Sequence, residues 1–365
     1  MRNLKGCFLR RTTVGLLSLA ALALPGRATA TVPDPGPEKS RIPFTTRYDS
    51  VLHGGIVRAA NAAITCRGAG SAEKAGCSAA RSGATASNGD FDMFYTDVDR
   101  DPNTYNSTRA EVRVPEGARV TYARLYWGGN LRAGEQKPPR DNGRVLVAEP
   151  GGAYKQLLAD EPAGHLTANG ADAFQASADV TDLVRAGGSG LYTVAQVNVA
   201  RGRTAAGAWG GWTLVVAYEK KSEPLRHLFL QDGFGTFTAR HPGQAFHQRT
   251  APAAGTGGYV GLVAYNGDRG RTGDSLTVAT GRGRPVALSD RANPARDVLN
   301  STISEPGTRP SRRVPAHANT LGYDSDVFPL GRAVRSGARA LDLRLTSPED
   351  AAWTGVLFGA VDVRS

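Results

Sequence analysis

Apolar and polar residues alternate along several short stretches of the chain, and this alternation predicts β-strands. Residues 119–127 alternate before reaching Gly128-Gly129, and residues 190–199 follow the same pattern. Residues 211–218 are almost continuously apolar, as expected of a central strand that is buried on both faces. Further strands are expected at 259–265, 275–278, 340–345 and 356–363.

Helical patterns are scarce between these stretches, which are separated by Gly, Pro, Asn and Asp. The best helix candidate is 179–187, where Asp179 or Thr181 would cap a single turn that ends at Gly187-Gly188. The pattern as a whole predicts an all-β fold, an antiparallel β-sandwich or jelly roll.

Composition along the chain divides it into four segments. Residues 1–30 have the form of a signal peptide, and residues 31–42 are a Pro-rich polar leader that we expect to be mobile. Residues 43–221 are expected to form a β-sandwich or jelly-roll domain. Residues 224–365 are either a second, packed β-sandwich domain or a continuation of the first.

The N-terminal segment predicts export. Four basic residues precede an apolar stretch at 14–24, and Ala28-Thr29-Ala30 supplies the small residues of a cleavage site. The apolar stretch is shorter than the roughly 20 residues that a membrane-spanning helix needs. We therefore expect a secreted, extracellular protein that begins at Thr31 and has no membrane span in its mature chain. Arg10-Arg11 leaves the twin-arginine route open beside general secretion.

The net charge changes when the signal peptide is removed. The full chain carries 44 basic and 33 acidic residues, a net charge of +11, and residues 31–365 carry 39 and 33, a net charge of +6. A basic secreted chain can attract anionic cell-wall polymers, although arginines scattered over strand surfaces would give the same number. No Lys/Arg run is interleaved with aromatic residues, so nucleic acid is not an expected partner.

Two cysteines remain after cleavage at residue 30. Cys66 and Cys77 bracket a segment rich in Gly, Ala and Ser, which we expect to be a loop. An even pair of cysteines in an exported protein predicts a disulfide. A free pair or half of a metal site is the alternative, but no His or further Cys lies close in sequence.

The densest acidic segment is a candidate calcium site. Asp97, Asp99, Asp101 and Asn103 alternate in the way that calcium loops gather oxygen ligands. An EF-hand is excluded, because Thr108 stands where the twelfth-position acid belongs. Acidic clusters also form Asx turns, so a loose calcium site and a simple turn both remain open. Acids from later loops that could add ligands are Asp268, Asp274, Asp324 and Asp326. No other cofactor is expected.

Support for catalysis is thin, and no catalytic residue is identified. The sequence contains no nucleophile elbow and no H-E-x-x-H zinc motif. Trp209 lies in the Gly-rich stretch Ala205–Gly211 and is the best candidate for an exposed ring that stacks on a sugar. Trp127, Trp212 and Trp353 lie in or beside predicted strands and are expected to be core residues.

A local resemblance supports the fold class. The run Ala178-Asp179-Val180-Thr181-Asp182-Leu183-Val184, Gly187 and the strand residues Tyr192-Thr193-Val194 resemble a piece of the galactose-binding-like jelly rolls. These jelly rolls are accessory domains of carbohydrate-active enzymes. The resemblance implies a fold rather than a sugar site.

A broader resemblance covers most of residues 31–365. The chain is similar to an uncharacterised secreted β-sandwich module of high-GC Gram-positive bacteria, which often precedes tandem sandwich repeats in surface proteins. The residues that carry this resemblance are 125–129, 211–216, 273–276, 300–304 and 321–324. No sorting motif follows the last strand of this sequence, so covalent anchoring to the wall is not expected.

These observations favour a secreted, non-enzymatic module that binds cell-wall polymer, polysaccharide or a partner protein. A secreted carbohydrate-active hydrolase and a purely structural envelope protein are the alternatives. A groove lined by aromatic rings and two facing carboxylates would favour the hydrolase. The sequence leaves the ligand and the oligomeric state undetermined.

Overall fold

A computed structural model describes residues 36–68, 71–238, 240–307, 311–349 and 351–364. Contacts between Cα atoms divide the chain into Met1–Pro33 and Asp34–Ser365. The predicted signal peptide and the first residues of the predicted leader lie outside the described residues. Among the residues that are described, no helix has the length and apolar character needed to cross a membrane.

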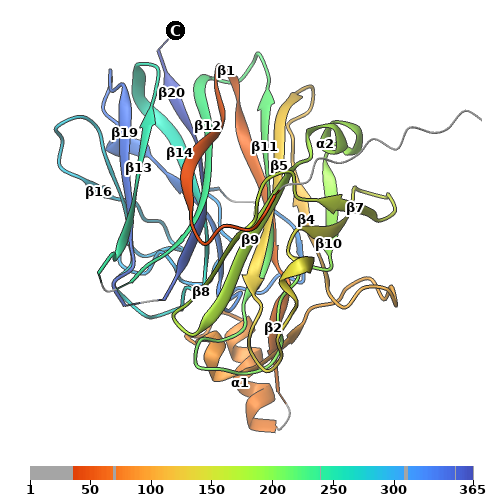
Figure 1. The fold of residues 1–365 in the computed structure, drawn as a ribbon. Coiled ribbons are helices and arrows are strands. Elements are labelled where there is room, and N and C mark those ends of the chain that lie inside the picture. The colour runs from red at the N-terminus through yellow and green to blue at the C-terminus, as the bar shows by residue number, and fades with distance from the viewer. Residues whose placement is uncertain (1–35, 69–70, 239, 308–310, 350, 365) are drawn as a thin grey trace, which may run out of the picture. The chain divides into compact units, whose positions relative to one another are not determined.

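Antiparallel strands dominate the unit Asp34–Ser365, as predicted (Figure 1). The strands are β1 (Ile42–Ala62), β2 (Ile64–Arg67), β3 (Asp92–Tyr95), β4 (Ser107–Val112), β5 (Arg119–Asn130), β6 (Arg144–Ala148), β7 (Lys155–Leu158), β8 (Gly164–Ala168), β9 (Ala171–Asp179), β10 (Gly190–Ala195), β11 (Gly210–Glu219), β12 (Leu225–Thr236), β13 (Gly243–Arg249), β14 (Ala253–Tyr265), β15 (Ser275–Ala279), β16 (Val286–Ala287), β17 (Arg313–Val314), β18 (Tyr323–Pro329), β19 (Ala340–Thr346) and β20 (Trp353–Val363). The helices are α1 (Ser71–Arg81) and α2 (Thr181–Gly187), with short 3-10 turns η1 (Asn88–Asp90), η2 (Pro139–Asp141) and η3 (Gly331–Ala333).

The long strand β1 stands at the centre of a nine-stranded sheet with the order β18-β14-β20-β12-β1-β11-β5-β9-β8. Its first part, from Ile42 to His53, pairs with β12. Its second part, from Gly54 to Ala62, pairs with β11. One strand thus belongs to two arms of the sheet, β11-β5-β9-β8 on one side and β12-β20-β14-β18 on the other.

Two glycines mark the point where β1 changes its partner. A Cβ atom on Gly54 would lie 2.0 Å from the carbonyl oxygen of Tyr218, and one on Gly55 would lie 2.7 Å from the Tyr218 hydroxyl oxygen. A side chain at either position would collide with these atoms. Glycine therefore lets the two arms approach closely here.

The two arms face each other across a shared apolar core. This core combines Tyr126 and Val215 of one arm with Leu230 and Phe358 of the other. Two further sheets cover the outer faces of the arms (Figure 1). The sheet β17-β4-β10-β6-β7 packs on the β11 arm, and the sheet β13-β19-β15-β16 packs on the β12 arm. The result is a set of stacked β-sandwich layers.

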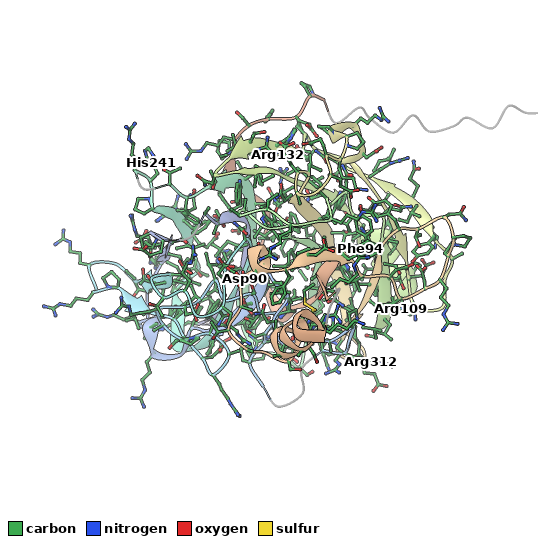
Figure 2. The ribbon with its side chains drawn as sticks, turned by 90° about the horizontal axis from the view of Figure 1, so that it is seen from below. Asp90, Phe94, Arg109, Arg132, His241 and Arg312 are labelled. Carbon is green, nitrogen blue, oxygen red and sulfur yellow. A yellow bond between two sulfur atoms is a disulfide. The ribbon has the colours of Figure 1, made fainter. Side chains whose placement is uncertain are left out.

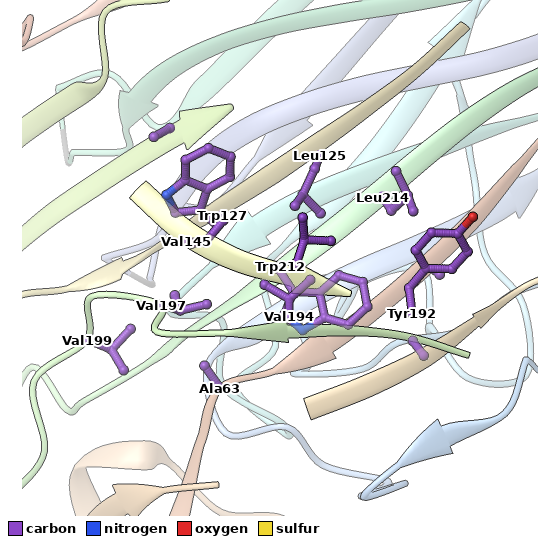
Figure 3. Packing of buried hydrophobic residues seen from close by; sticks show 14 of the residues in the cluster. Ala63, Leu125, Trp127, Val145, Tyr192, Val194, Val197, Val199, Trp212 and Leu214 are labelled. Carbon is purple, nitrogen blue, oxygen red and sulfur yellow. The ribbon is translucent and has the colours of Figure 1, made fainter. Parts of the chain in front are cut away.

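The tryptophans predicted to be core residues are buried. Trp127, Trp212 and Trp353 have no exposed surface. Figure 3 shows Trp127 and Trp212 among the aliphatic residues between the β11 arm and its outer sheet. The indole N–H of Trp127 donates to Asn142 O at 2.7 Å, and that of Trp212 donates to Thr108 Oγ1 at 2.8 Å. Both rings therefore bury their polar atom with a partner.

The predicted boundary near residues 221–224 falls between β11 and β12, which lie on opposite sides of β1. The halves nevertheless exchange strands. The first part of β1 joins the β12 arm, and β17 pairs with β4 in the outer sheet of the β11 arm. Residues Asp34–Ser365 form one compact unit.

Two local predictions are corrected by the structure. The segment after Cys66, expected to be a loop, contains α1, because Ala, Glu and Lys in Ser71–Arg81 favour a helix. The end of the leader, which we expected to be mobile, is hydrogen-bonded to the β8 region: Lys39 N donates to Ala163 O at 2.9 Å, and His165 N donates to Lys39 O at 2.8 Å.

The predicted helical turn at 179–187 is present as α2, with Gly188 at its end in a positive-φ conformation. Its start differs from the prediction. The N-cap residue is Val180, and its own side chain makes no capping hydrogen bond. The Asp179 carboxylate instead accepts from Thr181 N at 2.8 Å, and Thr181 Oγ1 accepts from Ala123 N at 2.9 Å on β5.

Candidate functional site

A polar cleft of about 610 Å³ lies where several connections between strands meet. Figure 2 labels one of its residues, Asp90. The cleft is lined by residues from five segments of the chain: Ser87, Asn88, Gly89, Asp90, Asn169, Gly170, Thr204, Ala205, Ala206, Asn266, Asp268, Arg271 and Ala351. The lining holds amide, carboxylate, hydroxyl and guanidinium groups, and no aromatic ring.

Hydrogen bonds fix the walls of the cleft relative to one another. The Asp90 carboxylate accepts from Ser87 N at 3.0 Å and so closes the turn η1. Asn88 Nδ2 donates to Asn266 Oδ1 at 3.0 Å, and Asn266 Nδ2 donates to Ala351 O at 3.2 Å. The buried amides of Asn88 and Asn266 thus link three of the lining segments. The exposed polar groups of the cleft lie above these hydrogen-bonded amides.

Asparagine also permits the backbone conformation of two lining loops. Asn169 has a φ of 49° and Asn266 a φ of 62°. This left-handed region is unfavourable for most side chains, but asparagine is enriched there. Gly170, next to Asn169, has a φ of 80°. The turn between β8 and β9 can therefore bring both residues to the cleft.

The two carboxyl groups in this cleft, those of Asp90 and Asp268, differ in their exposure to solvent. Asp90 is exposed. Asp268 is largely enclosed, and burial raises its pKa above the ordinary value for an aspartate. The Asp90 charge also raises the pKa of Asp268, while a hydrogen bond from Ser87 and the charge of Arg271 lower it. A protonated carboxyl group can donate a hydrogen bond that a carboxylate cannot.

Trp209, predicted to be an exposed stacking residue, is fully buried. Its ring centroid lies 5.1 Å from that of Trp353 and 5.8 Å from that of Tyr265. The stretch singled out by the sequence does reach the cleft, but through Ala205 and Ala206 rather than through the indole. The ring turns inward because apolar neighbours from both arms of the sheet surround it.

A partly exposed aromatic surface that the sequence analysis missed is formed by β3. Phe94, labelled in Figure 2, has the guanidinium carbon of Arg67 at 4.2 Å and that of Arg201 at 5.2 Å from its ring centroid. Lys137 lies 4.9 Å from the ring centroid of Tyr95. Met93 N donates to Gly202 O at 3.0 Å and so ties β3 to the loop that continues to the cleft. The available signal was the short run Met93-Phe94-Tyr95, which has the composition of a strand.

The predicted calcium residues Asp97, Asp99, Asp101 and Asn103 take part in hydrogen bonds around the loop in which they lie. Their carboxylates accept from nearby donors: Asp97 from Ser107 Oγ at 2.7 Å, Asp99 from Asp101 N at 2.8 Å and from the Tyr154 hydroxyl, and Asp101 from Asn103 N at 2.9 Å. The bonds from Asp101 N to Asp99 and from Asn103 N to Asp101 are those of Asx turns, the alternative interpretation. Over the described ranges, no three His, Cys, Asp or Glu side chains are arranged to hold a metal ion.

The predicted disulfide between Cys66 and Cys77 is confirmed. It joins β2 to α1, and both cysteines are buried. Arg81, at the end of α1, donates to Thr65 Oγ1 at 3.1 Å on the same strand. The bridge therefore fixes the helix that precedes the η1 wall of the cleft.

The geometry suits recognition of a polar ligand. An amide group can both donate to and accept from neighbouring hydroxyl groups, a carboxylate can accept from them, and a guanidinium can donate to them. Several segments supply such groups to one concave surface, which is the usual form of a small-ligand site.

Comparisons with known proteins give one family. Residues 82–263 match the model of a family described as "Protein of unknown function (DUF3344)". No curated protein matches the sequence. Among solved structures, the major capsid protein P2 of bacteriophage PM2 is 11% identical, over 85% of this chain and 98% of that one, with a TM-score of 0.20. The 7S globulin of Momordica charantia is 7% identical, over 71% of this chain and 70% of that one, with a TM-score of 0.18.

Proposed function

We propose that this protein is a secreted, non-enzymatic module that binds a polysaccharide or another hydroxyl-rich cell-wall polymer in the polar cleft. The observation that carries the proposal is the cleft of about 610 Å³ whose walls combine Asn88, Asn266, Asp90, Asp268 and Arg271. Sugar hydroxyls need donors and acceptors in alternation, and these side chains offer both.

The cleft is open to solvent at its rim and ordered at its base. Asp90 and Arg271 are exposed, whereas Asn88 and Asn266 are buried. The exposed side chains of Asp90 and Arg271 can contact a polymer without any rearrangement of the protein core. A site of this kind needs little reorganisation on binding, which favours affinity.

Secretion is supported by the disulfide and by the signal-like N-terminus. The Cys66–Cys77 disulfide is buried. Disulfides persist in oxidising surroundings and are rare in cytosolic proteins. We also propose that the protein is a relative of the secreted surface modules of high-GC Gram-positive bacteria. N-terminal sequencing of the exported protein tests the predicted start at Thr31, and recovery of the uncleaved chain in the membrane fraction would contradict it.

The binding proposal is tested by pull-down of residues 31–365 with insoluble cell-wall preparations and purified polysaccharides. Asp90→Ala and Arg271→Ala each remove a charged group from the cleft, and we expect either change to weaken binding about tenfold. Asp182→Ala and Arg332→Ala are matched controls on exposed residues outside the cleft lining. Equal binding by all four variants would overturn the proposal.

A hydrolase is the second candidate, because two carboxyl groups share the cleft and burial raises the pKa of one of them, Asp268. An acid of raised pKa next to an ionised carboxylate is the usual pairing for glycoside cleavage. The cleft lacks the aromatic lining expected of such an enzyme. Release of reducing ends that is lost in Asp268→Asn would establish the hydrolase in place of the binding module.

A further inference from the structure

The segment between β16 and β17 runs along the edge of β18, where Ser325 N donates to Thr302 O at 2.9 Å and Val327 N donates to Ser304 O at 3.0 Å. Thr302 N donates to Asp324 Oδ1 at 3.1 Å, and Ser304 N donates to Asp326 Oδ1 at 2.8 Å. These two carboxylates lie two residues apart on one strand and therefore on the same face. Both are buried.

Four side-chain oxygens converge beside this strand. Thr302 Oγ1 lies 2.7 Å from Asn300 Oδ1, 2.9 Å from Asn293 Oδ1 and 2.9 Å from Asp326 Oδ1. A hydroxyl group carries a single proton, so it can donate to only one of the three acceptors. These four oxygens therefore include three acceptors but only one proton, that of the Thr302 hydroxyl group.

Other hydrogen bonds fix the orientation of both amides. Asn300 Nδ2 donates to Ala292 O at 2.7 Å, and Asn293 Nδ2 donates to Ser304 Oγ at 2.7 Å. Reversing the Asn300 amide would set its oxygen against a carbonyl oxygen. The amide oxygens therefore face Thr302.

The Asp326 carboxylate also has an oxygen without a hydrogen-bond partner. Asp326 is 1% exposed, and its Oδ2 atom is buried with no partner among the described residues. Oδ2 of the neighbouring Asp324, which is 0% exposed, is in the same position. Two arginines carry charge close to Asp326, but Arg58 donates to Ser304 O at 2.6 Å and Arg313 donates to His317 O at 3.0 Å, and Oδ2 of Asp326 has no donor in the described part of the chain. A buried carboxylate in this state is costly unless a charge or proton neutralises it.

We propose that Asn293, Asn300, Thr302 and Asp326 bind a calcium ion. Calcium takes six to eight oxygen ligands at about 2.3–2.6 Å, often as a pentagonal bipyramid, and in the five-membered ring of that geometry neighbouring ligands lie about 2.8 Å apart. The observed spacings of 2.7–2.9 Å around Thr302 Oγ1 match that separation. One cation satisfies all four oxygens together, where a single proton satisfies one.

The chemistry of the donors selects calcium among common metals. All four are hard oxygen atoms, with no nitrogen or sulfur ligand of the kind that zinc prefers. Magnesium requires near-octahedral geometry at about 2.0–2.1 Å and keeps several waters. Three of the four donors are neutral side chains of Asn and Thr, which distinguishes this set from the acidic segment at 97–103.

The site would order one wall of the cleft without being part of it. Ser301 Oγ, next to Thr302, donates to Gly267 O at 2.6 Å, and Gly267 lies between the cleft residues Asn266 and Asp268. Calcium binding is nevertheless separable from polymer binding, because it is measured with no polymer present.

The test is calorimetric titration of CaCl2 into residues 31–365 after removal of metals with EDTA, together with thermal unfolding. We expect one site with a dissociation constant of about 10⁻⁴ to 10⁻³ M, as in other extracellular modules. Above that concentration the unfolding midpoint should rise by about 2 °C for each tenfold increase in calcium. An absent response, or an equal response to Na⁺ or Mg²⁺, would overturn the proposal.

Two isosteric variants locate the site. Asp326→Asn should abolish the response to calcium, and Thr302→Val, which keeps the shape but removes one ligand, should weaken calcium binding at least tenfold. Asp99→Asn is the control in the other acidic segment and should bind calcium as the unmodified chain does. If Asp326→Asn does not fold, Thr302→Val decides alone. Unchanged calcium affinity in Thr302→Val, or loss of binding in Asp99→Asn, would refute the assignment.

Discussion

The hydroxyl group of Tyr259 on β14 bonds to both backbone groups of Ile56 on β1. It accepts from Ile56 N at 2.6 Å and donates to Ile56 O at 2.8 Å. The last residue of β1 that pairs with β12 is His53. Beyond His53, β1 no longer pairs with β12. The Tyr259 hydroxyl group makes hydrogen bonds to Ile56 in place of that strand.

We predict that Tyr259→Phe destabilises the fold by about 1–3 kcal/mol, because it leaves the buried Ile56 N–H and C=O groups without this partner. Urea unfolding measures the change. Tyr48→Phe is the comparison: its hydroxyl bonds to Thr121 Oγ1 at 2.8 Å in a partly exposed position, where water can replace it. Similar losses for the two variants would contradict the role assigned to Tyr259.

A second prediction concerns the buried ionic contact between the arms. Asp232 of β12 accepts from Arg47 Nε at 2.7 Å and from the Tyr126 hydroxyl at 3.0 Å, and Arg124 Nε lies 3.6 Å from it. Asp232→Ala removes one carboxylate beside the buried Arg124 guanidinium, which keeps its ion pair with Asp160 at 2.5 Å, and we expect a loss of about 2–3 kcal/mol in the free energy of unfolding.

The control for this contact is Asp182→Ala. The Asp182 side chain is 96% exposed and pairs with Arg185 on the surface of α2, so its loss should change stability by less than about 1 kcal/mol. Asp232→Asn, which keeps one acceptor oxygen, should fall between the two. An Asp232→Ala protein as stable as the Asp182→Ala protein would rule out a stabilising role for this contact.

The third prediction is a dependence of stability on pH at the N-terminal segment. His165 Nδ1 lies 2.6 Å from Glu38 Oε2, and Nε2 lies 2.9 Å from Asp172 Oδ1. The hydrogen bond with Glu38 raises the pKa of His165 above its ordinary value of 6.5, and Asp172 adds to the rise. This stabilisation is fully present below pH 6.5 and is lost as the pH rises through the folded pKa.

Asp172, the acidic partner of His165, sets the lower pH limit of this stabilisation. Hydrogen bonds from Thr167, Gln136 and His165 outweigh the effect of burial and lower the pKa of Asp172, so its contribution is lost only as the pH falls below about 3.8. Between about pH 6 and pH 8 the unfolding midpoint should fall in the unmodified chain and stay more nearly constant in His165→Gln. His247→Gln, which alters an exposed histidine, should preserve the slope. Parallel curves for all three proteins would exclude the His165 contact as its source.

The fourth prediction concerns the Cys66–Cys77 bridge, which closes a loop with a sequence separation of 11. Replacing both cysteines by alanine should lower stability by about 2–4 kcal/mol and leave the strands intact, because the closed loop is local. Thermal unfolding and circular dichroism measure the two effects. Non-reducing peptide mapping of the exported protein should recover the linked peptides, whereas alkylation of both thiols without reductant would disprove the bridge.

The sequence predicts strands well wherever the pattern is decided by burial on one or both sides. The apolar run at 211–218 is β11, buried along almost its whole length in the centre of the sheet. The core positions of Trp127, Trp212 and Trp353 follow from the same argument. The alternation of apolar and polar residues indicates which face of a strand is buried. This pattern can be read from the residues of the strand itself.

The errors arise where distant contacts decide the outcome. Nothing in residues 42–62 marks one long strand with two partners, since the partner change depends on Tyr218 and Tyr259. The indole of Trp209 looks exposed in its Gly-rich segment, but Trp353 and Tyr265 come to cover it. The cleft joins five separate segments, so no spacing in the sequence announces it.

The position of β1 also constrains the order in which the protein can fold. Its residues 42–62 are made early, yet they pair with residues 211–219 and 225–234. The centre of the sheet therefore has to wait while a long stretch of chain is synthesised. Contacts of such high sequence separation slow folding and leave strand edges open for longer.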